Sequence, residues 1–411
     1  MKNLLGVWLT LAASAAFLTG CNPSTDTPTS KGSSSSDTPN TSAKRPNPPK
    51  DGPAFGETIK IGLVASLNGE LKPWGDDSKL GAELAADEIN KAGGINGKKI
   101  ELLVEDSNSK PEQGKTATDR LISKGVVGIV GEVASGITAQ IADSAFQAGV
   151  PVVAIGATRT DLTDIGSNIF RVCYTDDFQG PVMAKFGFEE LGLRRVAVLT
   201  DKRQPYSEGL SKSYIETFKK LGGTIISEEF YNSGDQQFNA QLTNIKGQNP
   251  DGLFLSGYFT EVGLIARQAR DVGLKVKLLG GDGWDSQELV SGGGEGILGG
   301  YFCNHYNDNE DRQEVKDFLT KWKAKYNGKL PGTTMGALGY DSVALVADAV
   351  KRAASPDAKG LMAAIDSTEN FLGVSGTITL KGHAGNPPKR ALVVEVTSSG
   401  VVFRKAYEHF E

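Results

Sequence analysis

The sequence predicts an α/β protein built on two parallel sheets, and two observations support this. Between residues 57 and 411, short apolar runs typical of buried strands alternate with longer stretches whose apolar residues recur at helical spacing. Such alternation indicates parallel strands connected by helices that cover both faces of a sheet. This part of the chain also exceeds the usual ~100–200 residues of one domain, so two sheets fit it better than one.

The individual elements follow from the same patterns. The run IKIGLVA at 59–65 predicts a buried strand, and 77–92 predicts a helix because Leu80, Leu84 and Ile89 recur on one face. Further strands are expected at 100–105, 126–130, 151–154, 169–173, 195–199, 224–229, 252–256, 277–279 and 301–303. Helices are expected at 111–123, 136–148, 178–191, 207–221, 236–247 and 260–272.

Composition excludes several classes of function. Of the 411 residues, 39% are hydrophobic and 23% are charged, as in ordinary soluble globular proteins. The 44 Lys and Arg are outnumbered by 49 Asp and Glu, so the chain gains no affinity from a phosphate backbone and nucleic acid is not an expected partner. Three Cys are too few for a disulfide scaffold or a zinc ribbon, and three dispersed His suggest no metal site.

The first 56 residues predict an export signal followed by a tether. Residues 1–20 combine Lys2 with an apolar run of the length found in secretory signals, and Leu18-Thr19-Gly20-Cys21 resembles a bacterial lipobox, in which Cys21 is acylated. An ordinary signal with a chance Cys is the alternative. Residues 22–56 contain 19 Ser, Thr or Pro among 35, so 21–56 is expected to be a disordered, acylated tether.

Three loops that follow strands are candidates for a binding site, because ligands of open α/β sheets bind beyond the carboxyl ends of the strands. These loops, at 131–136, 156–160 and 280–285, are rich in Gly and in polar side chains. Ser135 stands where a helix begins and is suited to hold an anion, although a plain helix-capping role is the alternative. Thr158 has the same ambiguity, whereas Asp282 has no Lys or Arg in its own loop and suits a cationic group.

At these loops the chain resembles the type I periplasmic binding proteins, specifically the branched-chain amino acid (Leu/Ile/Val) receptors of ABC importers. The resemblance rests on Gly75-Asp76 after Trp74, INKAGGING at 89–97, Ala157-Thr158, Phe178-Gln179-Gly180 and RQARDVGL at 267–274, in this order. It implies two Rossmann-like lobes joined by three crossover strands, with the ligand in the cleft between them. It also implies a first lobe of residues 57–175 and 306–384 and a second lobe of residues 176–305 and 385–411.

The resemblance further implies a site for a zwitterion. Ser135, Ala157 and Thr158 match the positions that hold the carboxylate of the amino acid in this family. Thr158 and an acidic residue hold the ammonium, and the acidic position falls on Asp282, where many members have Glu. The shorter side chain leaves a direct ion pair and a water-bridged one both open.

Aromatic residues complete the site that the resemblance implies. Tyr206 matches the tyrosine of the second lobe, Tyr258 or Phe259 its second aromatic residue, and Trp74 the residue beside the ligand side chain. For Trp74 and Tyr206, packing in the core or at the hinge is the alternative. Because the matched groups lie on both lobes, a bound zwitterion is expected to bridge them and to favour closure.

Cys173 and Cys303 fall where the family places neighbouring crossover strands. A disulfide between them is compatible with an exported protein, and two small buried thiols are equally compatible with the sequence.

Together these features predict a monomeric lipoprotein without cofactor, exported to the periplasm or the outer face of the cytoplasmic membrane. It is expected to capture a branched-chain or other apolar amino acid and to deliver it to the permease and ATPase of an ABC importer. The sequence has no nucleophile–base pattern, so no catalytic residue is expected, and the export signal argues against a DNA-binding regulator of this fold. A receptor for amides, urea or aromatic acids and a ligand-sensing ectodomain are the alternatives.

Overall fold

The structure, a computed structural model, describes residues 45–410. The expected signal peptide at 1–20 and the expected lipidation site Cys21 lie outside the described residues. Two large sheets organise the described chain, as the strand and helix pattern predicts. No helix within residues 45–410 is both long enough and apolar enough to cross a membrane.

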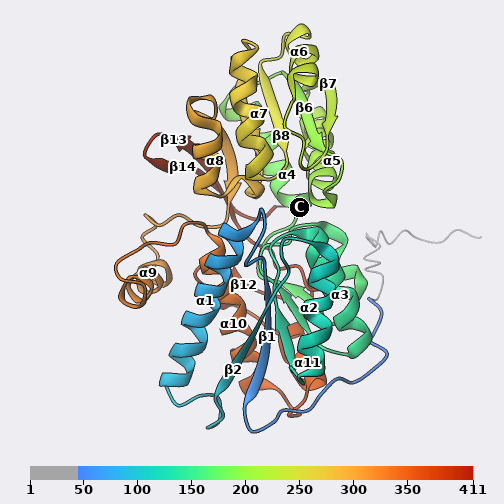
Figure 1. Ribbon diagram of the computed structural model, residues 1–411, viewed down its shortest axis with the longest axis vertical. Helices are drawn as coiled ribbons and strands as arrows, with labels where there is room; N and C mark the ends of the chain where they lie inside the picture. Colours follow the sequence, from blue (N-terminus) through green and yellow to red (C-terminus); the bar gives the residue numbers. More distant parts are fainter. Residues whose placement is uncertain (1–44, 411) are drawn as a thin grey trace, which may run out of the picture. The chain divides into compact units, whose positions relative to one another are not determined.

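The first lobe contains a five-stranded parallel sheet with helices on both faces (Figure 1). Helices α1 (Lys72–Lys91) and α10 (Met335–Arg352) pack on each other against one face, and α2 (Pro111–Ser123) and α3 (Ser135–Ala148) pack against the other. The strand order is β2 (Ile100–Asp106), β1 (Ile59–Ala65), β3 (Gly128–Val130), β4 (Val152–Ala154) and β5 (Ile169–Arg171).

The second lobe contains a seven-stranded sheet of mixed direction. The order is β14 (Gly400–Tyr407), β13 (Ala391–Thr397), β10 (Tyr301–Asn304), β9 (Lys277–Gly280), β8 (Gly252–Ser256), β6 (Arg195–Asp201) and β7 (Thr224–Tyr231). The five strands from β10 to β7 are parallel, as predicted. Strands β13 and β14, which the sequence pattern did not predict, add an antiparallel edge to this sheet.

The helices of the second lobe also cover both faces of their sheet. Helices α4 (Asp176–Lys185) and α5 (Pro205–Lys220) pack together, and α7 (Phe259–Asp271) packs on α8 (Gln287–Gly293) (Figure 1). The remaining elements are α6 (Asn239–Gly247), α9 (Gln313–Lys325), α11 (Ala358–Asp366), the hairpin β11 (Phe371–Gly373) and β12 (Gly376–Ile378), and four short turns of other helix types, η1 (Thr160–Ile165), η2 (Phe186–Glu190), η3 (Asp282–Trp284) and η4 (Gly294–Gly296).

The chain passes between the lobes three times, after β5, after β10 and before β13. The crossings contact one another: the backbone N–H of Arg171 donates to the carbonyl of Gly385 (3.1 Å), and the rings of Tyr174 and His305 stack with centroids 4.2 Å apart. A narrow, closely packed connection of this kind permits the lobes to move as units about it.

Residues 45–56, which composition assigns to the tether, pack on the first lobe. Arg45 donates from Nη1 to the carbonyl of Ile169 (2.7 Å), and the backbone N–H of Phe55 donates to the carbonyl of Pro356 (2.7 Å). The ordered chain therefore begins before residue 57. Polar composition did not reveal this, because hydrogen bonds from Arg45 and from the backbone, with Phe55 as one apolar contact, attach a segment that is otherwise polar.

One helix boundary bears directly on the site. Helix α1 begins at Lys72 instead of 77, with Pro73 in its first turn, where the missing N–H costs no hydrogen bond. Gly75 allows this turn to approach β1, because an added Cβ would lie 1.9 Å from the carbonyl oxygen of Ser66. The longer helix carries Trp74 to the end of the sheet.

Candidate functional site

A small cavity lies between the lobes where several helices begin. Trp74 of α1 and Ser135 of α3 face it from the first lobe, and Tyr206 of α5, Tyr258 and Asp282 face it from the second. The rest of the lining consists of Val133, Gly156, Gly283 and Met335. Its volume is about 10 Å³, room for about one water molecule. The lobes are therefore closed, and any larger ligand requires the lobes or these side chains to move.

The hydroxyl of Ser135 connects two loops of the first lobe. Helix α3 begins at Ser135 itself, and its N-cap residue is Ala134, which makes no side-chain cap. The Ser135 Oγ instead accepts a hydrogen bond from the backbone N–H of Arg159 (3.3 Å). The plain capping alternative for Ser135 is therefore wrong, and the hydroxyl lies between the start of α3 and the 156–160 loop.

The 156–160 loop is fixed from behind by a buried arginine. Arg171 donates from Nη1 to the carbonyl of Ala157 (2.7 Å) and from Nη2 to that of Arg159 (2.8 Å). Thr158 accepts at its hydroxyl from the Gln179 amide (3.4 Å) and at its carbonyl from the N–H of Asp176 (2.8 Å). Ala157 and Thr158 are buried outside the cavity lining, so the loop is a rigid backing for Gly156 and Ser135.

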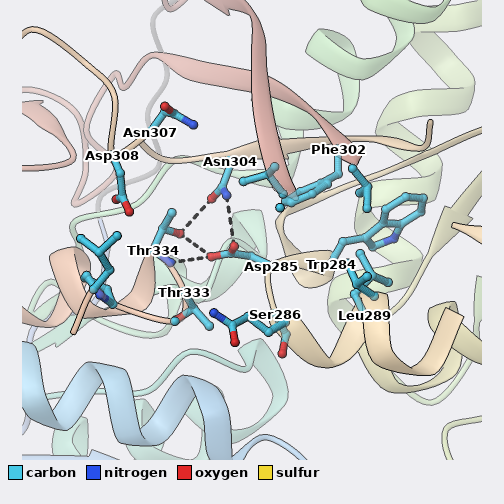
Figure 2. A pocket seen from close by; sticks show the side chains of 18 of the residues that line it. Trp284, Asp285, Ser286, Leu289, Phe302, Asn304, Asn307, Asp308, Thr333 and Thr334 are labelled. Atoms are coloured by element: carbon cyan, nitrogen blue, oxygen red, sulfur yellow. Dashed lines mark hydrogen bonds between the residues drawn. The ribbon is translucent and has the colours of Figure 1, made fainter. Parts of the chain in front are cut away.

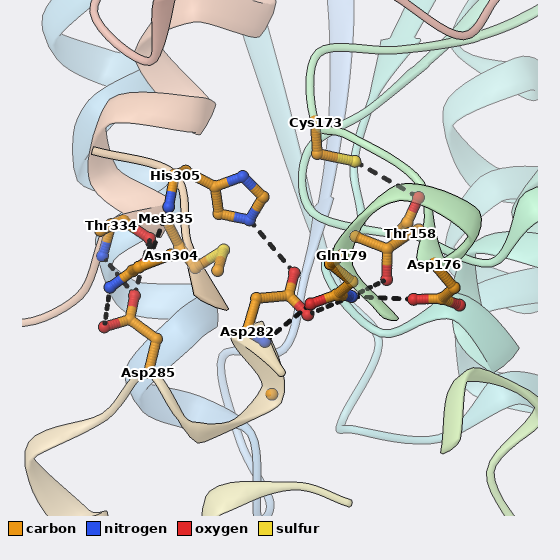
Figure 3. A network of polar contacts seen from close by, with 12 residues as sticks. Thr158, Cys173, Asp176, Gln179, Asp282, Asp285, Asn304, His305, Thr334 and Met335 are labelled. Atoms are coloured by element: carbon orange, nitrogen blue, oxygen red, sulfur yellow. Dashed lines mark hydrogen bonds and ion pairs between the residues drawn. The ribbon is translucent and has the colours of Figure 1, made fainter. Parts of the chain in front are cut away.

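The carboxylate of Asp282 is held by two side chains, as Figure 3 shows. Its Oδ1 accepts from the amide nitrogen of Gln179 (2.9 Å), and its Oδ2 lies 3.1 Å from Nε2 of His305. The Gln179 Oε1 in turn accepts from the backbone N–H of Asp282 (3.1 Å). The sequence suggested that Asp282 has a freely available carboxylate. The structure instead shows this carboxylate fixed in position at the cavity by Gln179 and His305.

Aromatic rings form the other side of the cavity. The Trp74 ring meets the rings of Tyr258 and Phe259 edge to face, with centroids 5.1 Å apart in both pairs, and Tyr206 stacks on Tyr258 at 5.3 Å. The Tyr206 hydroxyl accepts from the backbone N–H of Gly283 (2.9 Å). Trp74 and Tyr206 therefore both pack and line the cavity, while Phe259 is fully buried behind it.

One polar atom in this lining lacks a partner. The Tyr258 hydroxyl is buried and has no hydrogen-bond partner among the described residues. Burial also raises the pKa of Tyr258 well above its usual value, so the hydroxyl retains its proton. Buried polar groups of folded proteins are nearly always paired, so this hydroxyl is available to bind a polar group that enters the cavity.

Three residues of the site have no role assigned by the sequence: His305, Gln179 and Asp176. His305 directly follows β10, 23 residues after Asp282, and stands in no motif of the family resemblance, so its sequence position gave no signal. Gln179 stands in the Phe178-Gln179-Gly180 motif that supports the resemblance, which was the available clue. The Gln179 amide nitrogen also donates to Oδ1 of Asp176 (2.8 Å), so one amide joins two carboxyl groups.

Cys173 and Cys303 are both free and buried, so the possible disulfide is not present. The Cys173 thiol donates to the carbonyl of Ala157 (3.4 Å), and burial raises its pKa to about 12. Burial likewise raises the pKa of Cys303. Of the two possibilities that the sequence left open, the structure therefore has the pair of buried thiols.

A larger cavity of about 590 Å³ lies beside this site (Figure 2). Asp285 separates the two: its carbonyl accepts from the Trp74 indole N–H (2.7 Å), while its carboxylate faces the larger cavity. That carboxylate accepts from both the backbone N–H and the hydroxyl of Thr334 (2.7 Å each). Asp285 thereby joins the second lobe to the first outside the smaller cavity.

The family model of the periplasmic binding proteins matches residues 58–401. The Leu/Ile/Val-binding protein homolog 3 of Brucella melitensis is 34% identical over 73% of this chain and 80% of its own length. A leucine-binding protein LivK from Thermotoga maritima is 35% identical, with a TM-score of 0.81 over 85% of this chain and 99% of its own.

A second solved structure carries a ligand. The branched-chain amino acid transporter substrate-binding protein LivJ of Streptococcus pneumoniae, in complex with isoleucine, is 34% identical with a TM-score of 0.79, over 85% of this chain and 99% of its own. The chain therefore belongs to the periplasmic binding protein family, within the group of Leu/Ile/Val-binding protein homologues. This confirms the fold and the family that the sequence resemblance implied.

The contacts of Gln179 predict its effect on stability. Gln179→Met keeps the length of the side chain but leaves the carboxyl groups of Asp176 and Asp282 without their shared donor, so the free energy of unfolding should fall by at least ~2 kcal/mol. Urea denaturation measures it. Gln237→Met, on an exposed side chain, is the matched control and should change stability by less than ~0.5 kcal/mol. Equal effects of the two variants would contradict the role given to Gln179.

Proposed function

We propose that this chain is the extracytoplasmic substrate-binding component of an ABC importer and that it binds an amino acid with an apolar side chain without catalysing a reaction. The observation that carries the proposal is the cavity itself. Both lobes line it, one buried carboxylate and one unpaired hydroxyl face it, and none of its lining residues is Lys, Arg or His. Such a lining suits a ligand that brings its own positive charge.

In this proposal each end of the ligand contacts a different lobe. The ammonium lies beside Asp282 and the hydroxyl of Tyr258, and the carboxylate lies against Ser135 and the start of α3, where helix N–H groups favour an anion. Thr158 and Ala157 fix the loop behind the carboxylate. The apolar side chain lies against Trp74 and Tyr206, with Phe259 supporting the indole.

Closure follows from this division of contacts. Only the closed arrangement lets one zwitterion satisfy groups of both lobes, so binding shifts the balance between open and closed states by the difference in affinity. Exclusion of water from the closed cavity strengthens the charged contacts. A ligand that lacks one of its two charges closes the lobes less well.

The relatives support a branched-chain amino acid as the ligand. The Brucella relative is named as a Leu/Ile/Val-binding protein homologue, and the streptococcal structure contains isoleucine. The three relatives described above are all named as binding proteins, which supports a role without catalysis. The same proposal includes delivery of the ligand to a permease and its ATPase, and action as a monomer. It also assigns residues 57–175 and 306–384 to the first lobe and residues 176–305 and 385–411 to the second.

A thermal-shift screen of the full chain tests the ligand class directly. Leucine, isoleucine or valine at 100 times its Kd should stabilise the protein by about 2.7 kcal/mol, because ligand binds the folded state alone. Amides, urea and aromatic acids serve as comparison ligands on the same plate. A response to those compounds, with none to any amino acid, would contradict the proposal and favour the alternative receptor.

Anchoring through Cys21 is part of the proposal and has its own test. The lipobox-like Leu18-Thr19-Gly20-Cys21 predicts that the full chain sediments with membranes and takes up labelled fatty acid. Cys21→Ser should lose the label and release the protein from the membrane fraction, whereas Cys173→Ser, at a buried thiol, should retain both. Labelling that persists in Cys21→Ser would show that the anchor is elsewhere.

A further inference from the structure

Asp176 is a second buried carboxyl group next to the ligand site. It lies in the first turn of α4 and is fully shielded from solvent. Its Oδ1 accepts from the same Gln179 nitrogen that donates to Asp282, and its Oδ2 has no hydrogen-bond partner among the described residues (Figure 3). The two carboxyl groups are therefore separated by a single amide nitrogen.

The charges around Asp176 come from several elements. Asp282 faces it through Gln179, and the phenols of Tyr206 and Tyr258 belong to the same buried group. Arg171 on β5 attracts it, as does the more distant Arg159. Burial first, and then the negative charge of Asp282, raise the pKa of Asp176 to about 8, while the Gln179 amide, the Thr158 hydroxyl and Arg171 offset only part of this.

We propose that Asp176 and Asp282 act as a carboxyl pair that holds one proton in the ligand-free site and releases it to solvent when the ammonium of an amino acid binds beside Asp282. This inference rests on the proposed function and adds a proton to its binding reaction. It assigns to Asp176, which lies outside the cavity lining, the role of setting the charge that the site offers to its ligand.

The physical reason is that two close buried carboxylates do not both ionise unless a cation compensates them. With no ligand, one proton neutralises the pair. The arriving ammonium cancels the repulsion from Asp282, and Arg171 and the N-terminus of α4 already favour ionised Asp176, so the proton leaves.

The same pair discriminates between ligands by charge. A neutral amide or urea brings no positive charge, so it leaves the proton on the pair and gains no ion pair with Asp282. An amine-bearing ligand converts the pair into two carboxylates around its ammonium. Asp176 is thereby a specificity-determining residue, although it does not line the cavity.

The ligand-free site binds a proton that the complex lacks, so affinity rises with pH up to about 8, where Asp176 is already ionised, and then levels off. Below that pH, each increase of one pH unit should lower the Kd for L-leucine by up to ~10-fold. Near pH 7, binding of each leucine should release close to one proton.

Titration calorimetry of the full chain with L-leucine measures both quantities, because the observed heat changes with the ionisation heat of the buffer by the number of protons released. In Asp176→Asn the proton release and the pH slope between 6 and 8 should both disappear, while leucine still binds. Asp177→Asn removes the same charge from the exposed neighbouring residue and should behave as the parent protein.

The outcomes separate this inference from the proposed function. Leucine binding without proton release in the parent protein overturns the inference alone. Proton release that survives in Asp176→Asn but is lost in His305→Gln also overturns it, since the proton would then belong to the histidine beside Asp282. Failure of leucine, isoleucine and valine all to bind contradicts the proposed function itself.

Discussion

The buried carboxylate of Asp282 is the constraint on which the rest of the site depends. A charge removed from water is costly unless hydrogen bonds and an opposite charge compensate it. Gln179 and His305 supply the hydrogen bonds, and both residues are positioned by the chain crossings between the lobes. In the proposed complex the ammonium of the ligand supplies the compensating charge. Under that proposal binding and closure are coupled, because the ammonium is enclosed beside Asp282 only when the lobes are closed.

The lobes also contact each other outside the cavity. The carboxylate of Asp285 accepts two hydrogen bonds from Thr334, and its carbonyl accepts one from the Trp74 indole, so the second lobe is bonded to α1 and to the start of α10. These bonds contribute to the closed arrangement independently of the smaller cavity. In the proposed function, the ligand adds its differential affinity for the closed state to this contribution.

Much of this could be predicted from the sequence. Periodicity gave β1, β8 and α2 with their observed ends, because each is a regular run with clear boundaries. The loops that follow strands singled out Ser135 and Asp282, and the family resemblance added Trp74, which lies in the first turn of α1. Neither revealed His305, whose role depends on the chain crossing that follows β10. The sequence could not decide the helix-capping alternative for Ser135, because a shift of one residue in the start of α3 determines whether Ser135 or Ala134 is the N-cap residue.

The central claim is that Asp282 recognises the ammonium of the ligand, and a cycle of two ligands and two proteins tests it most directly. Affinities of leucine and of 4-methylpentanoate, which lacks the amine, are measured for the parent protein and for Asp282→Asn. Loss of the amine should weaken binding to the parent at least ~30-fold, as expected when a buried charge loses its partner, and should weaken binding to the variant far less. The same loss in both proteins would contradict the account.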